Sequence, residues 1–174
     1  MSRVYLIGFM GSGKTTVGKQ LARKMRWSFV DTDNIIEKEL GITVQEVFDQ
    51  LGEEWFREYE QKVLTKTTSF QNTIIATGGG TPCFYNNMDT IINNGLCIYL
   101  RMPPKEIVSR ISQSQKIRPL VYNLTGIKLE KYVEKTLVER ETVYLKAHLI
   151  ADALNPNLIH TLEQQIKRYF GTIK

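Results

Sequence analysis

The segment GFMGSGKTT, at residues 8–16, has the residue types and spacing of a phosphate-binding loop, GxxxxGK(S/T). Its glycines permit a tight turn in which backbone amides approach phosphate oxygens, and the helix expected after it adds partial positive charge at its N-terminus. In such a loop the ammonium of Lys14 reaches the β- and γ-phosphates, and the hydroxyl of Thr15 is a ligand of Mg²⁺. The segment therefore predicts a site for a nucleotide and magnesium formed by Gly11, Ser12, Gly13, Lys14, Thr15 and Thr16.

The alternative is a glycine-rich surface turn with a solvated lysine. It fits poorly, because an apolar strand pattern precedes the segment and a helical pattern follows it. ATP is favoured over GTP because the chain lacks the guanine-reading sequence NKxD. The HRD and DFG sequences of protein kinases are absent as well.

Two aspartates follow the next apolar segment, in the sequence FVDTDNIIE. Asp31 and Asp33 are expected at the carboxyl end of a strand, where ligands of open α/β sheets bind. One carboxylate there can accept the proton of an acceptor hydroxyl while the other acts on the magnesium shell. Asp31, Thr32 and Asp33 are also good N-caps for the helix that follows, and for Thr32 we expect capping alone.

The stretch LGEEWFREYE has helical character and places Arg57 and Glu60 on one face. Glu60 can then fix the Arg57 fork for bidentate recognition of a carboxylate. An isolated pair of this kind is more often an exposed ion pair worth under about 1 kcal/mol. Farther along, the apolar segment TIIA leads to Gly78, Gly79 and Gly80. These glycines allow a ligand to lie on the backbone, unless they form only a flexible surface turn.

In order along the chain, GxxxxGKT, DTD, FRxxE, GGG, RPL and RxxxY resemble the motif series of the shikimate kinase family. The likeness extends from the first expected strand to the last expected helix. Members of that family transfer the γ-phosphate of ATP to the 3-hydroxyl of shikimate, on the route to chorismate and the aromatic amino acids. The resemblance implies the same reaction here, with ATP and Mg²⁺ as cofactors and shikimate as the small-molecule substrate.

The resemblance also implies roles for the residues that match the family's motifs. Asp33 would hold the acceptor hydroxyl, and Asp31 would lie near the magnesium ion. The other matches are Arg57, Gly79, Gly80 and Arg140 around shikimate, with both arginines on its carboxylate, then Arg118 in a lid over the phosphates, and Arg110 and Pro156 at the adenine. The catalytic set is then Asp33, Lys14 and Arg118. The chain has RPLV where the family usually has RPLL, and like the family it lacks a Walker B aspartate on the third strand.

These residues need a scaffold of alternating strands and helices, and the apolar periodicity predicts one. Strands are expected at residues 4–7, 28–30, 73–76, 96–100 and 148–151, and helices at residues 15–25, 44–69, 87–94, 105–112, 128–146 and 158–169. The alternation favours parallel pairing with helices on both faces of the sheet. We therefore expect a three-layer α/β/α P-loop NTPase fold with a five-stranded parallel sheet. The weakly patterned stretch after the fourth predicted helix favours a lid at about residues 113–126.

Length and composition set the remaining expectations. A chain of 174 residues fits one domain, residues 1–174. Cys83 and Cys97 form no CxxC pair, which argues against a zinc site or a disulfide framework and favours the cytoplasm. Because no apolar run is long enough for a signal peptide or a membrane span, we expect a soluble protein with no membrane partner. We also expect a monomer.

The net charge of +5 leaves a second class of function open, a nucleic-acid-associated ATPase. No base-stacking or groove-reading module is evident, so we expect no nucleic-acid partner. Gluconate and adenylate kinases share the loop, but the arginine pair and the triple glycine argue against them. A regulatory nucleotide-binding module without catalysis would need no acceptor base such as Asp33.

Overall fold

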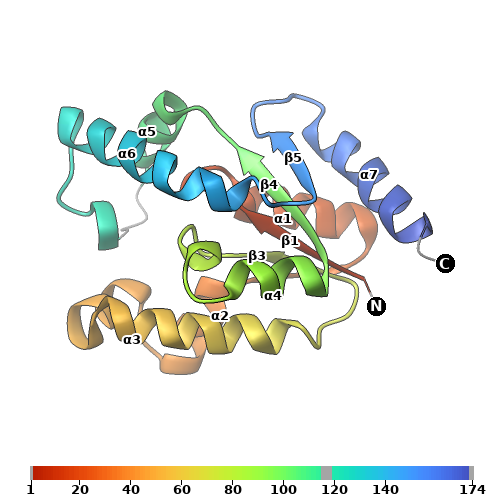
Figure 1. Ribbon diagram of the computed structural model, residues 1–174, viewed down its shortest axis with the longest axis horizontal. Coiled ribbons are helices and arrows are strands. Elements are labelled where there is room, and N and C mark those ends of the chain that lie inside the picture. Colours follow the sequence, from red (N-terminus) through yellow and green to blue (C-terminus); the bar gives the residue numbers. More distant parts are fainter. Residues whose placement is uncertain (1, 115–118, 173–174) are drawn as a thin grey trace.

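The five apolar segments form one parallel sheet in the computed structural model of the chain, which describes residues 2–114 and 119–172 (Figure 1). The strands are β1 Arg3–Ile7, β2 Ser28–Asp31, β3 Thr73–Ala76, β4 Leu96–Arg101 and β5 Leu149–Asp152. Their order across the sheet is β2-β3-β1-β4-β5, and every neighbouring pair is parallel. The predicted five-stranded parallel sheet is confirmed.

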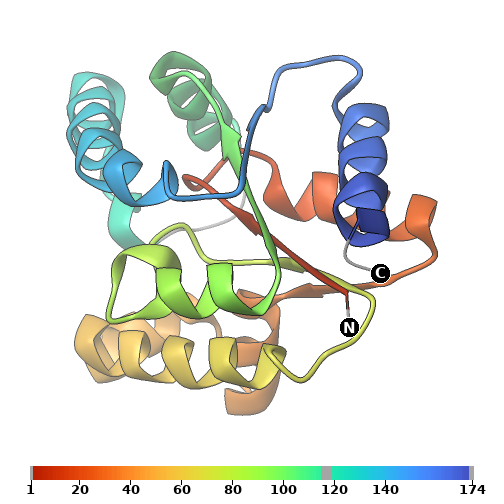
Figure 2. The same cartoon turned by 45° about the vertical axis from the view of Figure 1, so that its right-hand side comes forward.

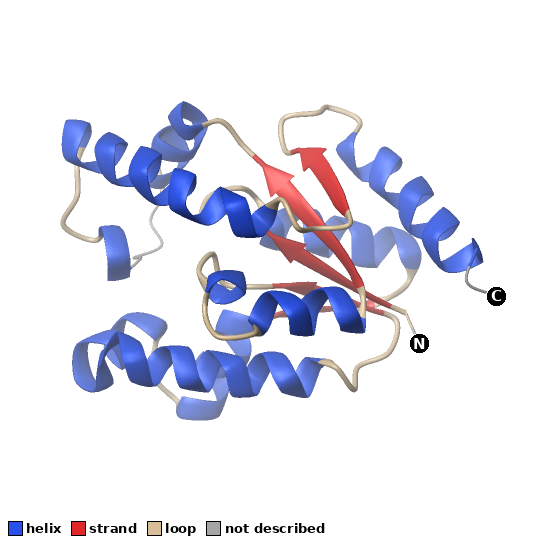
Figure 3. Cartoon of the chain, viewed as in Figure 1, coloured by secondary structure: helices blue, strands red, loops and turns tan. Residues whose placement is uncertain are grey.

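Helices cover both faces of the sheet, as Figure 3 shows with the strands in red between blue helices. Successive side chains of a strand point to opposite faces, so Tyr5 and Ile7 join one buried cluster while Val4 and Leu6 join the other. The first layer contains α3 Val44–Thr67, α4 Asn87–Asn94, α5 Pro104–Ser112 and α6 Gly126–Tyr144, and the second contains α1 Lys14–Met25 and α7 Leu158–Thr172. Figure 2 shows α7 beside α1, away from α3 and α6. The α/β/α layering is therefore as predicted.

A shorter helix, α2 Thr32–Leu40, packs against α3 through a separate apolar cluster. Periodicity predicts one continuous helix over residues 44–69, but Gly52 interrupts it with φ 84° and ψ 169°. Glycine reaches this backbone conformation at little cost, which explains the break. The part of α3 after Gly52 carries the FRxxE motif to the edge of the sheet.

The chain reverses direction across the sheet at β1, which lies between β3 and β4. Connections that leave the carboxyl ends of the strands at such a reversal diverge, and a ligand can bind between them. The phosphate-binding loop follows β1, Asp31 ends β2, and the three glycines come shortly after β3. The topology thus brings three motifs that are distant in sequence to one edge of the sheet.

The packing of α1 on β2 gives a stability prediction at Gly18. A Cβ at this position would lie against the Phe29 ring, closer than non-bonded atoms allow. We expect Gly18→Ala to destabilise the protein by about 1–3 kcal/mol, because the ring must move, although helix propensity alone would favour alanine by about 1 kcal/mol. Urea unfolding measures the difference.

Gly171→Ala in α7 is the matched control, since a Cβ there meets nothing within 4 Å. This variant should be as stable as the parent or slightly more stable. Stabilisation by both substitutions would contradict the close contact between α1 and β2.

Candidate active site

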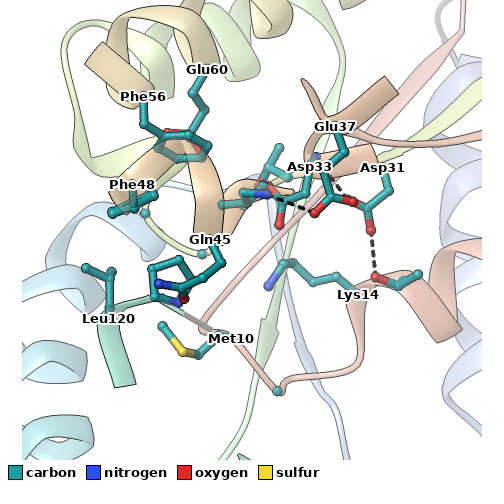
Figure 4. A pocket seen from close by; sticks show the side chains of 18 of the residues that line it. Met10, Lys14, Asp31, Asp33, Glu37, Gln45, Phe48, Phe56, Glu60 and Leu120 are labelled. Carbon is teal, nitrogen blue, oxygen red and sulfur yellow. Dashed lines mark hydrogen bonds between the residues drawn. The ribbon is translucent and has the colours of Figure 1, made fainter. Parts of the chain in front are cut away.

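A cavity of about 930 Å³ opens at the carboxyl edge of the sheet. Figure 4 shows Lys14, Asp31 and Asp33 on one side of it and Phe48 and Glu60 on the other. Most of the predicted site residues line this cavity, namely Gly11, Gly13, Lys14, Thr15, Thr16, Asp31, Asp33, Arg57, Gly79, Gly80, Arg110 and Arg140. The fold therefore gathers the nucleotide motif and the acceptor motifs in one place.

Three predicted residues are not among those that line the cavity. Ser12 is buried, and its hydroxyl has no hydrogen-bond partner within the described part of the chain. Pro156 is exposed in the connection from β5 to α7. Arg118 lies outside the described residues, as do residues 115–117 of the expected lid. The roles of all three stay predictions.

The phosphate-binding loop (residues 8–16) is fixed by close backbone packing. A Cβ at Gly8 would lie 2.7 Å from the carbonyl oxygen of Leu100, so β4 leaves room only for glycine. Gly13, with φ 92°, turns the chain into α1. The Nζ of Lys14 donates to the carbonyl oxygens of Gly8 and Phe9 at 2.7 and 2.9 Å. The ammonium is thus held at the loop, where phosphate oxygens can replace these carbonyls.

Asp31 links the phosphate-binding loop to α2. Its Oδ2 accepts from the Thr15 hydroxyl at 2.7 Å, a bond drawn in Figure 4, and its Oδ1 accepts from the Asp33 N–H at 3.1 Å. Asp31 is therefore the N-cap of α2, and the predicted capping role of Thr32 is wrong. Thr32 is already the first helical residue, and its buried hydroxyl accepts from the Gly78 N–H at 3.2 Å.

Arg57 is enclosed by carboxylates and an aromatic ring. Its Nη1 donates to Glu60 at 2.8 Å, its Nη2 donates to Glu53 at 3.0 Å, and its guanidinium carbon lies 4.2 Å from the centre of the Phe84 ring. Arg57 is 4% exposed and Glu60 is 0% exposed. This burial excludes the alternative that the two residues form an isolated ion pair on the surface. Burial alone lowers the pKa of Arg57, but Glu60 and Glu53 more than offset it, so the pKa is raised and the group stays charged.

Two of the three glycines after β3 pack directly against this group. A Cβ at Gly80 would lie 2.8 Å from Nη2 of Arg57, and a Cβ at Gly78 would lie 2.6 Å from Oε1 of Glu60. The same Oε1 accepts from the Thr81 hydroxyl at 2.5 Å. These close approaches argue against a flexible surface turn, and they require the bare backbone that only glycine provides.

Sequence reasoning missed two partners of Arg57. Glu53 lies four residues before it in α3, so the helical spacing could have identified this carboxylate. Phe84 comes after the glycines, and no local pattern connects it with α3. Only the tertiary fold brings that ring under the guanidinium.

Known proteins resemble this chain over nearly its whole length. The family model described as shikimate kinase matches residues 10–170. A shikimate kinase of Phocaeicola vulgatus is 40% identical over 156 residues, which cover 88% of this chain and 89% of that protein. The crystal structure of shikimate kinase from Bacteroides thetaiotaomicron matches with a TM-score of 0.88 and 34% identity over 98% of each chain. Shikimate kinase from Acinetobacter baumannii in complex with shikimate matches with a TM-score of 0.86 and 32% identity, over 100% of this chain and 95% of that one. This chain therefore belongs to the shikimate kinase family.

Proposed function

We propose that this protein transfers the γ-phosphoryl group of ATP to the 3-hydroxyl of shikimate, giving ADP and shikimate 3-phosphate on the route to chorismate and the aromatic amino acids. The observation that carries the proposal is that one cavity joins the phosphate-binding loop to the buried, charged Arg57. The loop suits a nucleoside triphosphate, and the guanidinium suits a carboxylate. Family membership supports the same reaction, as does the A. baumannii relative, which was solved in complex with shikimate.

Phosphoryl transfer depends on positioned reactants and on stabilisation of the moving charge. Lys14 is proposed to follow the negative charge of the transferring group. Asp33 is proposed to orient the 3-hydroxyl and take up its proton, because its carboxylate lines the cavity from the first turn of α2. Arg118 is the third proposed catalytic residue, on the strength of its family match alone.

Thr15 and Asp31 fit a magnesium ion. Their side-chain oxygens lie 2.7 Å apart, and both residues line the cavity beside the loop. Mg²⁺ prefers oxygen ligands and usually takes only one or two from the protein, the others coming from phosphates and water. When bound, the ion would neutralise charge on the phosphates of ATP. We propose Thr15 and Asp31 as the residues that hold it.

The remaining nucleotide contacts are proposed from the loop and from the family match. Gly11, Ser12, Gly13 and Thr16 would surround the phosphates. Arg110 is proposed at the adenine, and it lies near the loop, with its Nη1 3.4 Å from the position that a Cβ of Gly13 would take. Pro156 at the adenine and a lid at residues 113–126 that brings Arg118 over the phosphates complete the proposal.

Arg57 and Arg140 are proposed to bind the carboxylate of shikimate, with Gly79 and Gly80 beside the ring. We expect Arg57→Lys to raise KM for shikimate by about ten- to a hundredfold, because a point ammonium cannot reproduce the guanidinium fork. This contact is made in the ground state and the transition state alike, so kcat and KM for ATP should stay near their parent values. Steady-state assays with each substrate varied in turn separate these constants.

The matched control is Arg101→Lys. Arg101 also pairs with a glutamate, its Nε lying 2.9 Å from Glu141, but it is exposed and outside the cavity. The KM of the Arg101→Lys variant for shikimate should not change. A rise in KM for ATP in the Arg57 variant would place Arg57 on the phosphate side instead.

An ADP-release assay with candidate acceptors tests the proposed function. With ATP and Mg²⁺ present, shikimate should stimulate ADP release well above the background rate, whereas gluconate, AMP and single-stranded nucleic acid should not. Equal stimulation by gluconate or AMP would contradict the acceptor assignment. Stimulation by nucleic acid alone would favour the ATPase alternative raised by the net charge.

We also propose that the protein acts as a monomer in the cytoplasm. Both cysteines are free thiols, as a reducing compartment favours. Of the helices within residues 2–114 and 119–172, none is long and apolar enough to cross a bilayer. Light scattering coupled to gel filtration measures the oligomeric state.

A further inference from the structure

The RxxxY motif specifies Arg140 and Tyr144, and the proposed reaction gives a role to Arg140 but none to Tyr144. It ends α6, four residues after Arg140, so the two side chains lie on one helical face. Its side chain is fully buried, and its ring centre lies 5.1 Å from that of Tyr99. Its hydroxyl lies 2.5 Å from the carbonyl oxygen of Gly79, at the edge of the cavity.

The direction of this hydrogen bond is fixed by chemistry. Burial raises the pKa of Tyr144 far above the ordinary phenol value, so the hydroxyl keeps its proton. A carbonyl oxygen can only accept, so the phenol donates to Gly79. The bond therefore holds the carbonyl group of the peptide that joins Gly79 to Gly80.

Holding the Gly79 carbonyl also orients the Gly80 N–H of the same peptide. A trans peptide is planar, and its C=O and N–H groups point in opposite directions. With the Gly79 carbonyl held toward α6, the Gly80 N–H must face away from α6. The Cα of Gly80 is in turn confined by the guanidinium of Arg57, because a Cβ there would lie 2.8 Å from Nη2. Two glycines in succession would otherwise rotate at little cost.

The same contact fixes the turn of α6 that presents Arg140. The guanidinium carbon of Arg140 lies 5.6 Å from the centre of the Phe9 ring, and its charge acts on the Tyr144 hydroxyl. Its Nη1 is buried and has no hydrogen-bond partner within the described residues. A buried donor of this kind is costly to leave unpaired, which suits a site that receives a carboxylate oxygen.

We propose that Tyr144 is a positioning residue of the shikimate site, whose hydroxyl locks the Gly79–Gly80 peptide to the turn of α6 that carries Arg140. The inference rests on the proposed function and adds a residue to it. Without the hydroxyl, the glycine peptide and the Arg140 turn move independently. Only a fraction of the molecules then present both in the binding geometry, and the apparent affinity for shikimate falls by that fraction.

The test is Tyr144→Phe, which removes the hydroxyl and keeps the buried ring. We expect KM for shikimate, and the dissociation constant measured by calorimetry without nucleotide, to rise about tenfold. KM for ATP and kcat should stay within about twofold, since the loop and Asp33 are untouched. Tyr144→4-aminophenylalanine restores a donor at the same ring position and should return KM toward the parent value.

Tyr99→Phe is the matched control. It removes a hydroxyl from the same aromatic pair, but that hydroxyl donates to Glu141 at 3.3 Å and does not reach the glycines. Unchanged shikimate affinity in the Tyr144→Phe variant would overturn the proposal, as would an equal loss in the Tyr99→Phe control. Tyr144→Phe could prove too unstable to assay, and the 4-aminophenylalanine variant then decides. If that variant is folded and keeps the parent affinity for shikimate, the proposal is supported. If it is folded and binds shikimate about tenfold more weakly, the proposal is contradicted. Failure of the unaltered protein to release ADP with shikimate would instead refute the proposed function.

Discussion

Replacing Lys14 with methionine is expected to lower kcat by about three to five powers of ten while the protein stays folded. The ammonium supplies positive charge where negative charge develops during transfer, and a positioned charge in a site that excludes water is worth far more than in bulk water. Lys14 is buried, and its Nζ bonds to the carbonyls of Gly8 and Phe9. Methionine keeps the aliphatic stem and so removes the charge with little loss of packing.

Lys19→Met provides the control for the loss of one positive charge on the same helix. Lys19 is exposed on α1 and does not line the cavity. The kcat of the Lys19→Met variant should equal that of the parent. Because the Lys14 variant also loses two hydrogen bonds, a melting curve must accompany the assay. A folded Lys14→Met protein with normal turnover would show that the charge has no part in transfer.

Asp33→Asn is expected to lower kcat by about two to four powers of ten, with a much smaller change in KM for shikimate. Asparagine keeps the shape of the side chain and a hydrogen-bond acceptor, but it loses the negative charge that takes up the proton of the hydroxyl. The position is tightly defined, since Oδ1 lies 3.1 Å from where a Cβ of Gly78 would be and the Asp33 N–H donates to Asp31. Steady-state kinetics with shikimate varied at saturating ATP gives both constants.

Part of any effect could come from the helix, because a carboxylate in the first turn stabilises the helix N-terminus. Asp89→Asn removes a carboxylate from the first turn of α4, where the side chain is exposed and outside the cavity. It should leave both constants unchanged. If Asp33→Asn raised KM and left kcat intact, Asp33 would be a binding residue and not a base.

The sheet and the phosphate-binding loop were predictable because their signals are local. Each strand is a short apolar run, and the loop is a contiguous motif. The backbone geometry of the loop requires glycine, for example where Gly8 packs against Leu100. Parallel pairing then follows from the alternation with helices. The sequence thereby placed Asp31 and the three glycines at the same edge of the sheet as the loop.

The finer structure was less predictable because it depends on contacts between distant segments. The FRxxE spacing indicated that Glu60 could hold Arg57, but burial of the pair depends on Phe84 and on the glycines after β3. The periodicity of α3 hid the break at Gly52, since one glycine in a helical pattern is often tolerated. Thr32 has a good capping side chain, yet its position one residue inside α2 directs its hydroxyl to Gly78.

The position of the transferred phosphate shows whether the 3-hydroxyl of shikimate is the acceptor. The protein would be incubated with ATP, Mg²⁺ and shikimate, and the product examined by phosphorus–proton correlation NMR. We expect a single phosphate ester, with its phosphorus coupled to the proton on C3 of the ring and formed in step with ADP. An ester on a different hydroxyl, or ADP with inorganic phosphate and no ester, would contradict transfer to the 3-hydroxyl of shikimate.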